Sequence, residues 1–191
     1  MTAYSIRWLA IIGWIIQTGF KRYIALPPFL VANSMMLKIG DAGAKGKGVF
    51  AASTIEPGDV VLEYDGEVRW IWDIPRELWP FAFQVDYDRY IVPERGSAGW
   101  YLNHSCEPNC VIRGKRRITA LVRIDVGEEV TIDYSTNVGW DGFAMECNCG
   151  SPTCRKVIRS YHYLDDQQKR RYGACVSPFL LERDAPAPQS A

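Results

Sequence analysis

Four of the six cysteines have a spacing that suits a metal ion. Cys147, Cys149 and Cys154 form a C-x-C-x4-C run, and Cys106 stands well upstream of them. Zn²⁺ prefers four tetrahedral ligands, and thiolate sulfur is one of its usual ligands in proteins. Such a site would close a long loop and fasten the C-terminal segment to the body of the domain. The spacing therefore predicts a structural zinc site at Cys106, Cys147, Cys149 and Cys154.

Burial and disulfide formation are the alternative explanations of these cysteines. A lone cysteine usually packs as a small apolar side chain, and we expect this of Cys110 and Cys175. A chain of 191 residues is longer than those in which an even cysteine count indicates a disulfide framework. Cys147 and Cys149 are also too close in the chain for an unstrained bridge. The spacing differs from that of the common zinc fingers, so zinc is favoured but plain burial stays open.

Two of the motifs resemble those of a known family. The run Asn-His-Ser-Cys-Glu-Pro-Asn-Cys at residues 103–110 resembles the signature of the SET-domain protein lysine methyltransferases. The run Cys-Asn-Cys-Gly-Ser-Pro-Thr-Cys-Arg-Lys at residues 147–156 resembles the post-SET zinc motif that follows it in many members. The resemblance extends from about Gly40 to about Ile158, and the short chain is similar to the small, microbial-type members.

The resemblance implies an enzymatic function. The chain would transfer a methyl group from S-adenosylmethionine to the ε-amino group of a protein lysine, with histone tails among the candidate substrates. The alternative is a catalytically weak SET-like module that zinc stabilises and that binds a peptide or the cofactor without turnover. A purely structural zinc protein is the third interpretation. A hydrolase triad is not supported, because the two histidines show no Ser-His-Asp spacing.

Site residues follow from the resemblance position by position. Tyr134, at the end of an expected strand, matches the catalytic tyrosine of the family. The positions that match its cofactor-binding residues are Lys45, Lys47, Gly48, Val49, Phe81, Asn103, His104 and Asn148. In the family, the asparagine contacts the methionine part of the cofactor and the histidine backbone binds the adenine. The positions expected to line the substrate channel are Tyr64, Phe81, Ile132 and Tyr134.

Three residues depart from the family pattern. Phe81 replaces a frequent tyrosine and lacks its hydroxyl. Trp100 replaces a usual arginine, so a structural ion pair is lost and the indole ring is expected to pack instead. Ile132, two residues before Tyr134, replaces a usual phenylalanine or tyrosine. Because isoleucine is smaller and makes no hydrogen bond, we expect room for more than one methyl group on the product.

The strand pattern predicts a mostly β fold. Alternating or β-branched segments at residues 60–64, 81–86, 90–92, 118–124 and 130–134 are typical of short strands. The resemblance implies a β-clip-like SET fold with small sheets, a C-terminal pseudoknot and a zinc-bound post-SET segment. The expected boundaries are an N-terminal extension at 1–36, the SET domain at 37–140, the post-SET zinc segment at 141–160, and a C-terminal helix with a disordered tail at 161–191.

The first 36 residues differ in composition from the rest. Their apolar stretch at residues 8–16 is shorter than the roughly 20 residues that a membrane span needs. A signal peptide is conceivable, but no small-residue cleavage pattern follows closely. We favour either a disordered extension or an upstream start assigned in error, with the natural start at Met35 or Met36.

Charge and cysteine usage indicate the partners. The chain has 22 basic and 22 acidic residues, so no direct nucleic-acid binding is expected, and the basic run at residues 113–117 is expected to be a solvated turn. Acidic residues at 63, 65 and 67 could attract a protein substrate with a basic, lysine-containing tail. Thiols held for a metal fit a reducing compartment, so the protein is expected to be intracellular, in the cytoplasm or a nucleus. We expect a monomer and no membrane partner.

Overall fold

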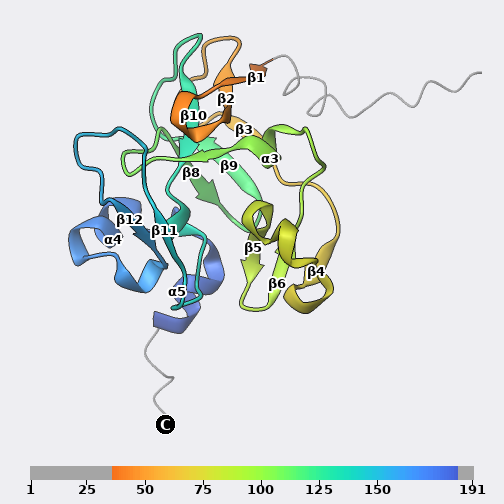
Figure 1. Ribbon diagram of the computed structural model, residues 1–191. Helices are drawn as coiled ribbons and strands as arrows, with labels where there is room; N and C mark the ends of the chain where they lie inside the picture. Colours follow the sequence, from red (N-terminus) through yellow and green to blue (C-terminus); the bar gives the residue numbers. More distant parts are fainter. Residues whose placement is uncertain (1–35, 185–191) are drawn as a thin grey trace, which may run out of the picture. The chain divides into compact units, whose positions relative to one another are not determined.

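The structure is a computed structural model that describes residues 36–184. The expected N-terminal extension, apart from its last residue, and the final seven residues lie outside this range (Figure 1). No helix between residues 36 and 184 is long and apolar enough to cross a membrane. Short strands dominate this part of the chain, as its alternating segments predict.

A mixed sheet brings the two ends of the SET-like region together. It contains β1 (Leu37–Asp41), β2 (Lys47–Ala51), β10 (Glu129–Ile132) and β7 (Asn103–His104), in the order β1-β2-β10-β7. Strands β1, β2 and β10 pair antiparallel, whereas β7 runs parallel to β10, with Asn103 opposite Thr131. In this order β10 lies between β2 and β7. Residues far apart in the sequence therefore meet on one sheet.

Three smaller antiparallel sheets complete the strand content of the described residues. The first contains β3 (Val60–Glu63), β9 (Arg117–Ala120) and β8 (Cys110–Arg113). The second contains β4 (Val68–Trp70), β6 (Arg89–Ile91) and β5 (Phe83–Asp86). The third is the hairpin of β11 (Ala144–Glu146) and β12 (Val157–Arg159), whose connection carries the three clustered cysteines.

Helices in the described part of the chain are short. They are α3 (Ala98–Tyr101), α4 (Asp166–Tyr172) and α5 (Pro178–Asp184). Single 3-10 turns lie at Gly43–Lys45, Ile71–Asp73, Arg76–Phe81, Tyr134–Thr136 and Tyr161–Tyr163. Helix α4 begins with a capping box, in which Asp165 accepts from the backbone of Gln168 and the Gln168 side chain accepts from Asp165.

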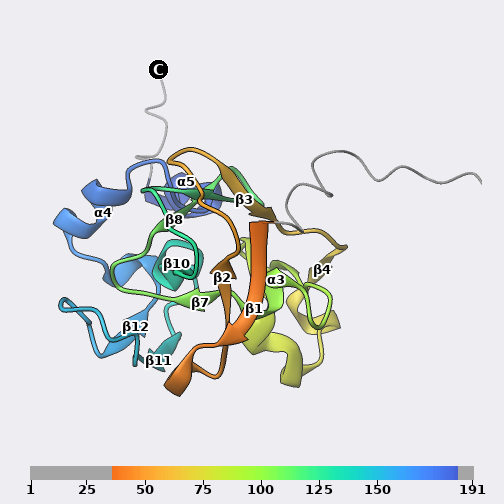
Figure 2. The same ribbon diagram turned by 90° about the horizontal axis from the view of Figure 1, so that it is seen from above.

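Two apolar clusters hold the sheets and the C-terminal helices. The main core lies among the first three sheets and includes Val49, Ile112, Val130 and Ile132. A second cluster packs α4 and α5 through buried side chains such as Tyr172 and Leu180. Figures 1 and 2 both show these helices on the side remote from β1. The fold-class prediction of a mostly β protein with small sheets and few helices is confirmed, and the pseudoknot stays a prediction.

Candidate active site

Gly48 in β2 lies where no side chain would fit. A Cβ atom at this position would stand 2.6 Å from Glu129 Oε1, 2.9 Å from Ala42 Cβ and 3.0 Å from Asn103 Nδ2. Real Cβ contacts are longer than this, so any larger residue would displace the Glu129 and Asn103 side chains and Ala42. Glycine is therefore required here to let the opening loop, β7 and β10 approach one another.

Glu129 joins the residues that the sequence assigned to the cofactor. Asn103 Nδ2 donates to Glu129 Oε1 at 2.8 Å and to the Lys47 carbonyl at 3.0 Å. The ammonium of Lys45 forms an ion pair with the same carboxylate. The structure thus gathers Lys45, Lys47, Gly48 and Asn103 around one acidic side chain. Sequence reasoning did not single out Glu129, although it stands in the Gly-Glu-Glu pattern that precedes the catalytic strand.

Three other predicted cofactor residues lie outside this network. Val49 is fully buried in the main core, and its backbone lies between Ile39 of β1 and Val130 of β10. Asn148 is exposed between two cysteines of the β11–β12 connection. Phe81 stacks on Trp100 with ring centroids 3.9 Å apart and an interplanar angle of 12°. The two aromatic departures from the family pattern therefore pack against each other, as the sequence suggested for Trp100.

His104 connects Tyr134 to Cys106. Its Nδ1 accepts from the backbone N–H of Tyr134 at 3.1 Å, and its Nε2 lies 3.3 Å from Cys106 Sγ. Burial lowers the pKa of His104 to about 4, although the Asp133 carboxylate acts in the opposite direction. A neutral imidazole with an occupied Nδ1 carries its proton on Nε2. The ring therefore donates to the Cys106 sulfur, a role of the side chain that the sequence did not indicate.

Tyr134 follows β10 directly and is half-buried. Its hydroxyl donates to the Leu102 carbonyl at 2.7 Å, immediately before the Asn-His pair. Burial raises the pKa of this hydroxyl well above its usual range, and the Glu129 carboxylate adds to the shift. The phenol thus stays protonated at neutral pH. It can orient a hydrogen-bonding partner, but it cannot act as a general base.

Two of the other predicted channel residues lie beside Tyr134. Tyr64 and Ile132 are buried in the main core, and Tyr134 packs against that core. Tyr64 donates to the Gly99 carbonyl at 3.3 Å and stacks on Phe83, with ring centroids 4.0 Å apart. Burial, and to a smaller extent Tyr134, raises the pKa of Tyr64. The fourth predicted channel residue, Phe81, is instead engaged with Trp100.

Three of the four predicted cysteines gather in the structure, together with His104. Ligand atoms of His104, Cys106, Cys147 and Cys149 all lie within 4.8 Å of one another. The Sγ atoms of Cys106 and Cys147 are 3.8 Å apart, and Cys154 Sγ donates to the Cys147 carbonyl at 3.6 Å. Four sulfurs bound to zinc at about 2.3 Å would be about 3.8 Å apart along the edges of a tetrahedron. The Cys106–Cys147 distance therefore fits two thiolates of one zinc site, and Cys154 as the fourth ligand stays a prediction.

Local hydrogen bonds prepare one of the thiols to ionise. Burial raises the pKa of the Cys106 and Cys147 thiols. Burial also acts to raise the pKa of Cys149, but hydrogen bonds from Ser151 and from backbone N–H groups outweigh it and lower the pKa. All six cysteines are free of disulfides. Metal binding needs thiolates. Of these three cysteines, Cys149 has the lowered pKa that favours the thiolate.

The buried carboxylate of Asp133 connects Arg155 and Tyr172, two residues of the C-terminal part, to the segment that carries Tyr134. Asp133 is inaccessible to solvent and accepts from both Nη atoms of Arg155, at 2.6 and 2.7 Å. It also accepts from the Tyr172 hydroxyl at 2.8 Å and from the Ser135 backbone at 3.0 Å. The Arg155 backbone N–H lies 3.3 Å from Cys106 Sγ. These contacts of Asp133 were missed from the sequence, where Arg155 stands only as part of the run at residues 147–156.

Comparison with known proteins identifies the domain. Residues 46–135 match the sequence model of the SET domain family. The chain is 35% identical over 129 residues to the Homo sapiens protein Histone-lysine N-methyltransferase 2B, covering 59% of this chain and 5% of the relative. It is 32% identical over 146 residues to the Schizosaccharomyces pombe Histone-lysine N-methyltransferase, H3 lysine-4 specific, covering 68% and 16%. The chain thus spans a small fraction of the length of these relatives.

Solved structures share the fold. The crystal structure of KRYPTONITE in complex with mCHG DNA and SAH has a TM-score of 0.51 and 28% identity, covering 64% of this chain and 28% of that one. The methyltransferase domain of human Histone-lysine N-methyltransferase SETMAR has a TM-score of 0.52 and 22% identity, covering 65% and 58%. With the motif residues gathered as described above, residues 46–135 of this chain are a SET domain.

Proposed function

We propose that this protein transfers a methyl group from S-adenosylmethionine to the ε-amino group of a protein lysine. The observation that carries the proposal is the parallel pairing of β7 with β10, which sets the Asn103-His104 pair beside the strand that ends two residues before Tyr134. Relatives that match this region are named histone-lysine N-methyltransferases. The related KRYPTONITE structure contains SAH, the form of the cofactor without its methyl group.

The cofactor would be held by the network around Glu129. Both N–H groups of the Asn103 amide are engaged by protein oxygens, which leaves Oδ1 to accept from an ammonium group. The exposed Lys47 carries a positive charge that suits a carboxylate. The bare backbone at Gly48 leaves room for the Glu129 and Asn103 side chains that form this network. When bound, S-adenosylmethionine supplies an electrophilic methyl group on its sulfonium sulfur.

The channel residues prepare the lysine. A lysine ε-amine must be neutral to act as a nucleophile, and burial lowers its pKa because it disfavours the charged form. Tyr64 and Ile132 supply the buried surroundings. Tyr134 donates its proton to Leu102, so its oxygen can accept from the amine and direct the nitrogen lone pair. Alignment of this kind can supply a large part of a rate enhancement.

We also propose that Cys106, Cys147, Cys149 and Cys154 bind a structural zinc ion that takes no part in the chemistry. The metal would hold the β11–β12 connection, and so Arg155, against the catalytic strand. Free thiols support an intracellular location. The names of the relatives support a basic, lysine-containing protein tail as substrate, with histone tails as the first candidates.

The test is transfer of labelled methyl groups from S-adenosylmethionine to core histones and to a whole-cell protein extract. Labelled bands are expected with the natural protein and should be lost in Tyr134→Phe. Tyr163→Phe is the matched control, because Tyr163 is exposed and lies outside the site. Absence of transfer to any protein by a chain that still binds the cofactor would contradict the proposal and favour a non-catalytic binding module.

A further inference from the structure

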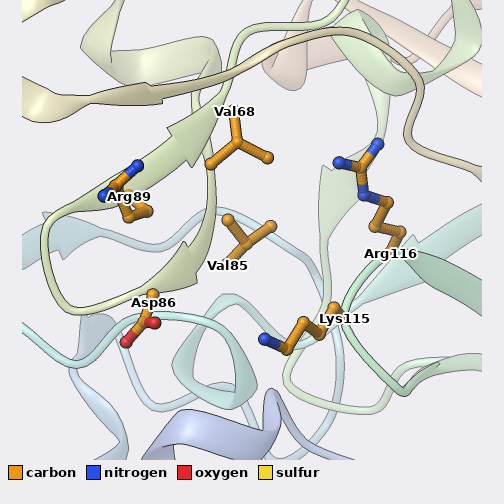
Figure 3. Close-up of a pocket in the computed structure, with 6 residues that line it drawn as sticks. All are labelled: Val68, Val85, Asp86, Arg89, Lys115 and Arg116. Atoms are coloured by element: carbon orange, nitrogen blue, oxygen red, sulfur yellow. The ribbon is translucent and has the colours of Figure 1, made fainter.

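The basic run at residues 113–117 is the largely exposed turn that its composition suggested, and two of its residues also line a cavity. Lys115 and Arg116 stand in the turn between β8 and β9 and line a cavity of about 260 Å³. The sheet of β4, β6 and β5 supplies the other lining residues, which are Val68, Val85, Asp86 and Arg89 (Figure 3). None of these residues belongs to the candidate active site.

The cavity combines an apolar centre with a charged rim. Figure 3 shows Val68 and Val85 between the side chains of Arg89 on one side and Arg116 on the other. The ammonium of Lys115 and the carboxylate of Asp86 lie along the lower rim in this view. Val85 is buried and Val68 half-buried, so their methyl groups form a firm surface. A ligand that suits this arrangement has a charged head and a short apolar stem.

The three cations of the cavity lack acidic partners. The ion pairs between residues 36 and 184 do not include Arg89, Lys115 or Arg116. Arg116 Nη1 donates to the Gly66 carbonyl at 3.4 Å, and the Arg89 guanidinium lies over the Trp70 ring, 3.3 Å from its centroid. A guanidinium has five N–H donors, so both arginines keep donors for a ligand.

The charge balance favours a dianion. Three cations against the single Asp86 carboxylate leave an excess of two positive charges around the cavity. A phosphomonoester carries about −1.5 to −2 charges at neutral pH, whereas a carboxylate carries one. Arginine forks also match phosphate oxygens in geometry. We propose that the cavity binds the phosphorylated side chain of a phosphoserine or phosphothreonine in a partner protein, with its carbon stem against Val68 and Val85.

A protein side chain fits better than a nucleic-acid strand. Each phosphodiester has a single negative charge, and a strand places further phosphates on either side of the one that is bound. Asp86 on the rim would repel such neighbours. The chain also has no overall excess of basic residues, with 22 of each sign. The inference does not depend on the proposed methyl transfer, because it concerns a separate set of residues and is read out by binding alone.

Isothermal titration calorimetry on the full chain tests the proposal. The probes are an acetylated and amidated Ala-phosphothreonine-Ala peptide, its unphosphorylated form and inorganic phosphate. We expect the phosphopeptide to bind, the unphosphorylated peptide not to bind, and inorganic phosphate to bind more weakly because it cannot contact the valines. Equal affinity for inorganic phosphate would overturn the assignment to a side chain, and absence of phosphopeptide binding would overturn the site itself.

Variants of the cavity separate specific binding from general charge. Lys115→Ala should weaken phosphopeptide binding about tenfold, as expected for loss of a charge-assisted hydrogen bond. Arg113→Ala is the matched control, because Arg113 is exposed at the end of β8, next to the same turn, and does not line the cavity. Asp86→Asn should tighten binding by removing a repulsive charge. Equal effects of the Lys115 and Arg113 changes, or tighter binding of a short DNA duplex than of the phosphopeptide, would contradict the proposal.

Discussion

Both carboxylate oxygens of Asp133 accept hydrogen bonds from the guanidinium of Arg155, and Asp133 is buried whereas Arg155 is partly buried. Asp133 directly precedes Tyr134, and Arg155 directly follows Cys154. The connection between β11 and β12 is thereby joined to the segment that carries Tyr134 by a charged contact. Disturbance of either partner should therefore affect stability and activity together.

Asp133→Asn should destabilise the fold by about 3 kcal/mol, because it leaves the Arg155 guanidinium without its charge partner in a largely buried place. Urea unfolding followed by tryptophan fluorescence measures the change. Glu63→Gln is the control, since it breaks the exposed pair with Arg117 and should cost under about 1 kcal/mol. Similar losses of unfolding free energy in the two variants would show that the Asp133–Arg155 pair contributes no more to stability than an exposed pair.

Gly48→Ala should weaken S-adenosylmethionine binding by about tenfold, because the new methyl group would push Glu129 and Asn103 out of place. Titration calorimetry with the cofactor checks this. Gly40→Ala, on the paired strand β1, serves as control, since its Cβ would meet only the ring of Phe50. An unchanged affinity in Gly48→Ala would remove this region from the cofactor site.

Chelation of the metal should lower methyl transfer by loosening residues 147–158, and not by removal of a catalytic Lewis acid. Hydrogen exchange should then rise in this segment and in its contact with Asp133. Metal analysis of the natural protein is expected to give one zinc per chain, and Cys147→Ser should reduce that content. Cys175→Ser, outside the cluster, should not. Full activity in a metal-free protein would refute this account.

Ile132→Phe should shift the product toward fewer methyl groups, because a ring takes up space beside Tyr134 in a buried position. Mass spectrometry of a substrate peptide at reaction exhaustion gives the distribution. Overpacking could also cost about 1–3 kcal/mol of stability, so Ile132→Val, which keeps the space open, is measured in parallel. A natural protein that adds a single methyl group only would contradict the expectation of multiple methylation.

Stability should fall as the pH rises above about 10, and Tyr64→Phe should reduce this fall. Burial raises the pKa of Tyr64, so the folded chain keeps a proton that the unfolded chain loses at high pH. The stabilisation is complete below the unfolded pKa and declines above it, by up to about 1.4 kcal/mol per pH unit for one group. Urea unfolding of both proteins between pH 8 and 11 measures the slope. Equal slopes of unfolding free energy against pH in the natural protein and in Tyr64→Phe would contradict the prediction.

The sequence allowed the strands and the metal cluster to be predicted for clear physical reasons. Alternation of apolar residues reports which face of a strand is buried, so segments such as 130–134 were recognisable. Thiols are scarce and have few roles, so the spacing of Cys147, Cys149 and Cys154 was informative. In both cases the signal lies within a short stretch of chain.

Contacts between distant segments carried no such signal. Nothing in the residues around Asp133 indicates that Arg155 and Tyr172 will meet it, because charged and phenolic side chains have many possible partners. No periodic pattern in the sequence indicates that Phe81 will stack on Trp100. The basic run at 113–117 is exposed as expected, but the sequence does not show which sheet will face the turn.

The position of the partners of Asp133 along the chain has a consequence for synthesis on the ribosome. A nascent chain that has emerged as far as residue 150 already contains β10 and Asp133. Neither Arg155 nor Tyr172 is yet available to donate to the Asp133 carboxylate. An isolated charge of this kind is costly to bury. The segment around Asp133 and Tyr134 should therefore reach its buried position only after α4 has been synthesised. A chain truncated before α4 should fold poorly and not merely lose a helix.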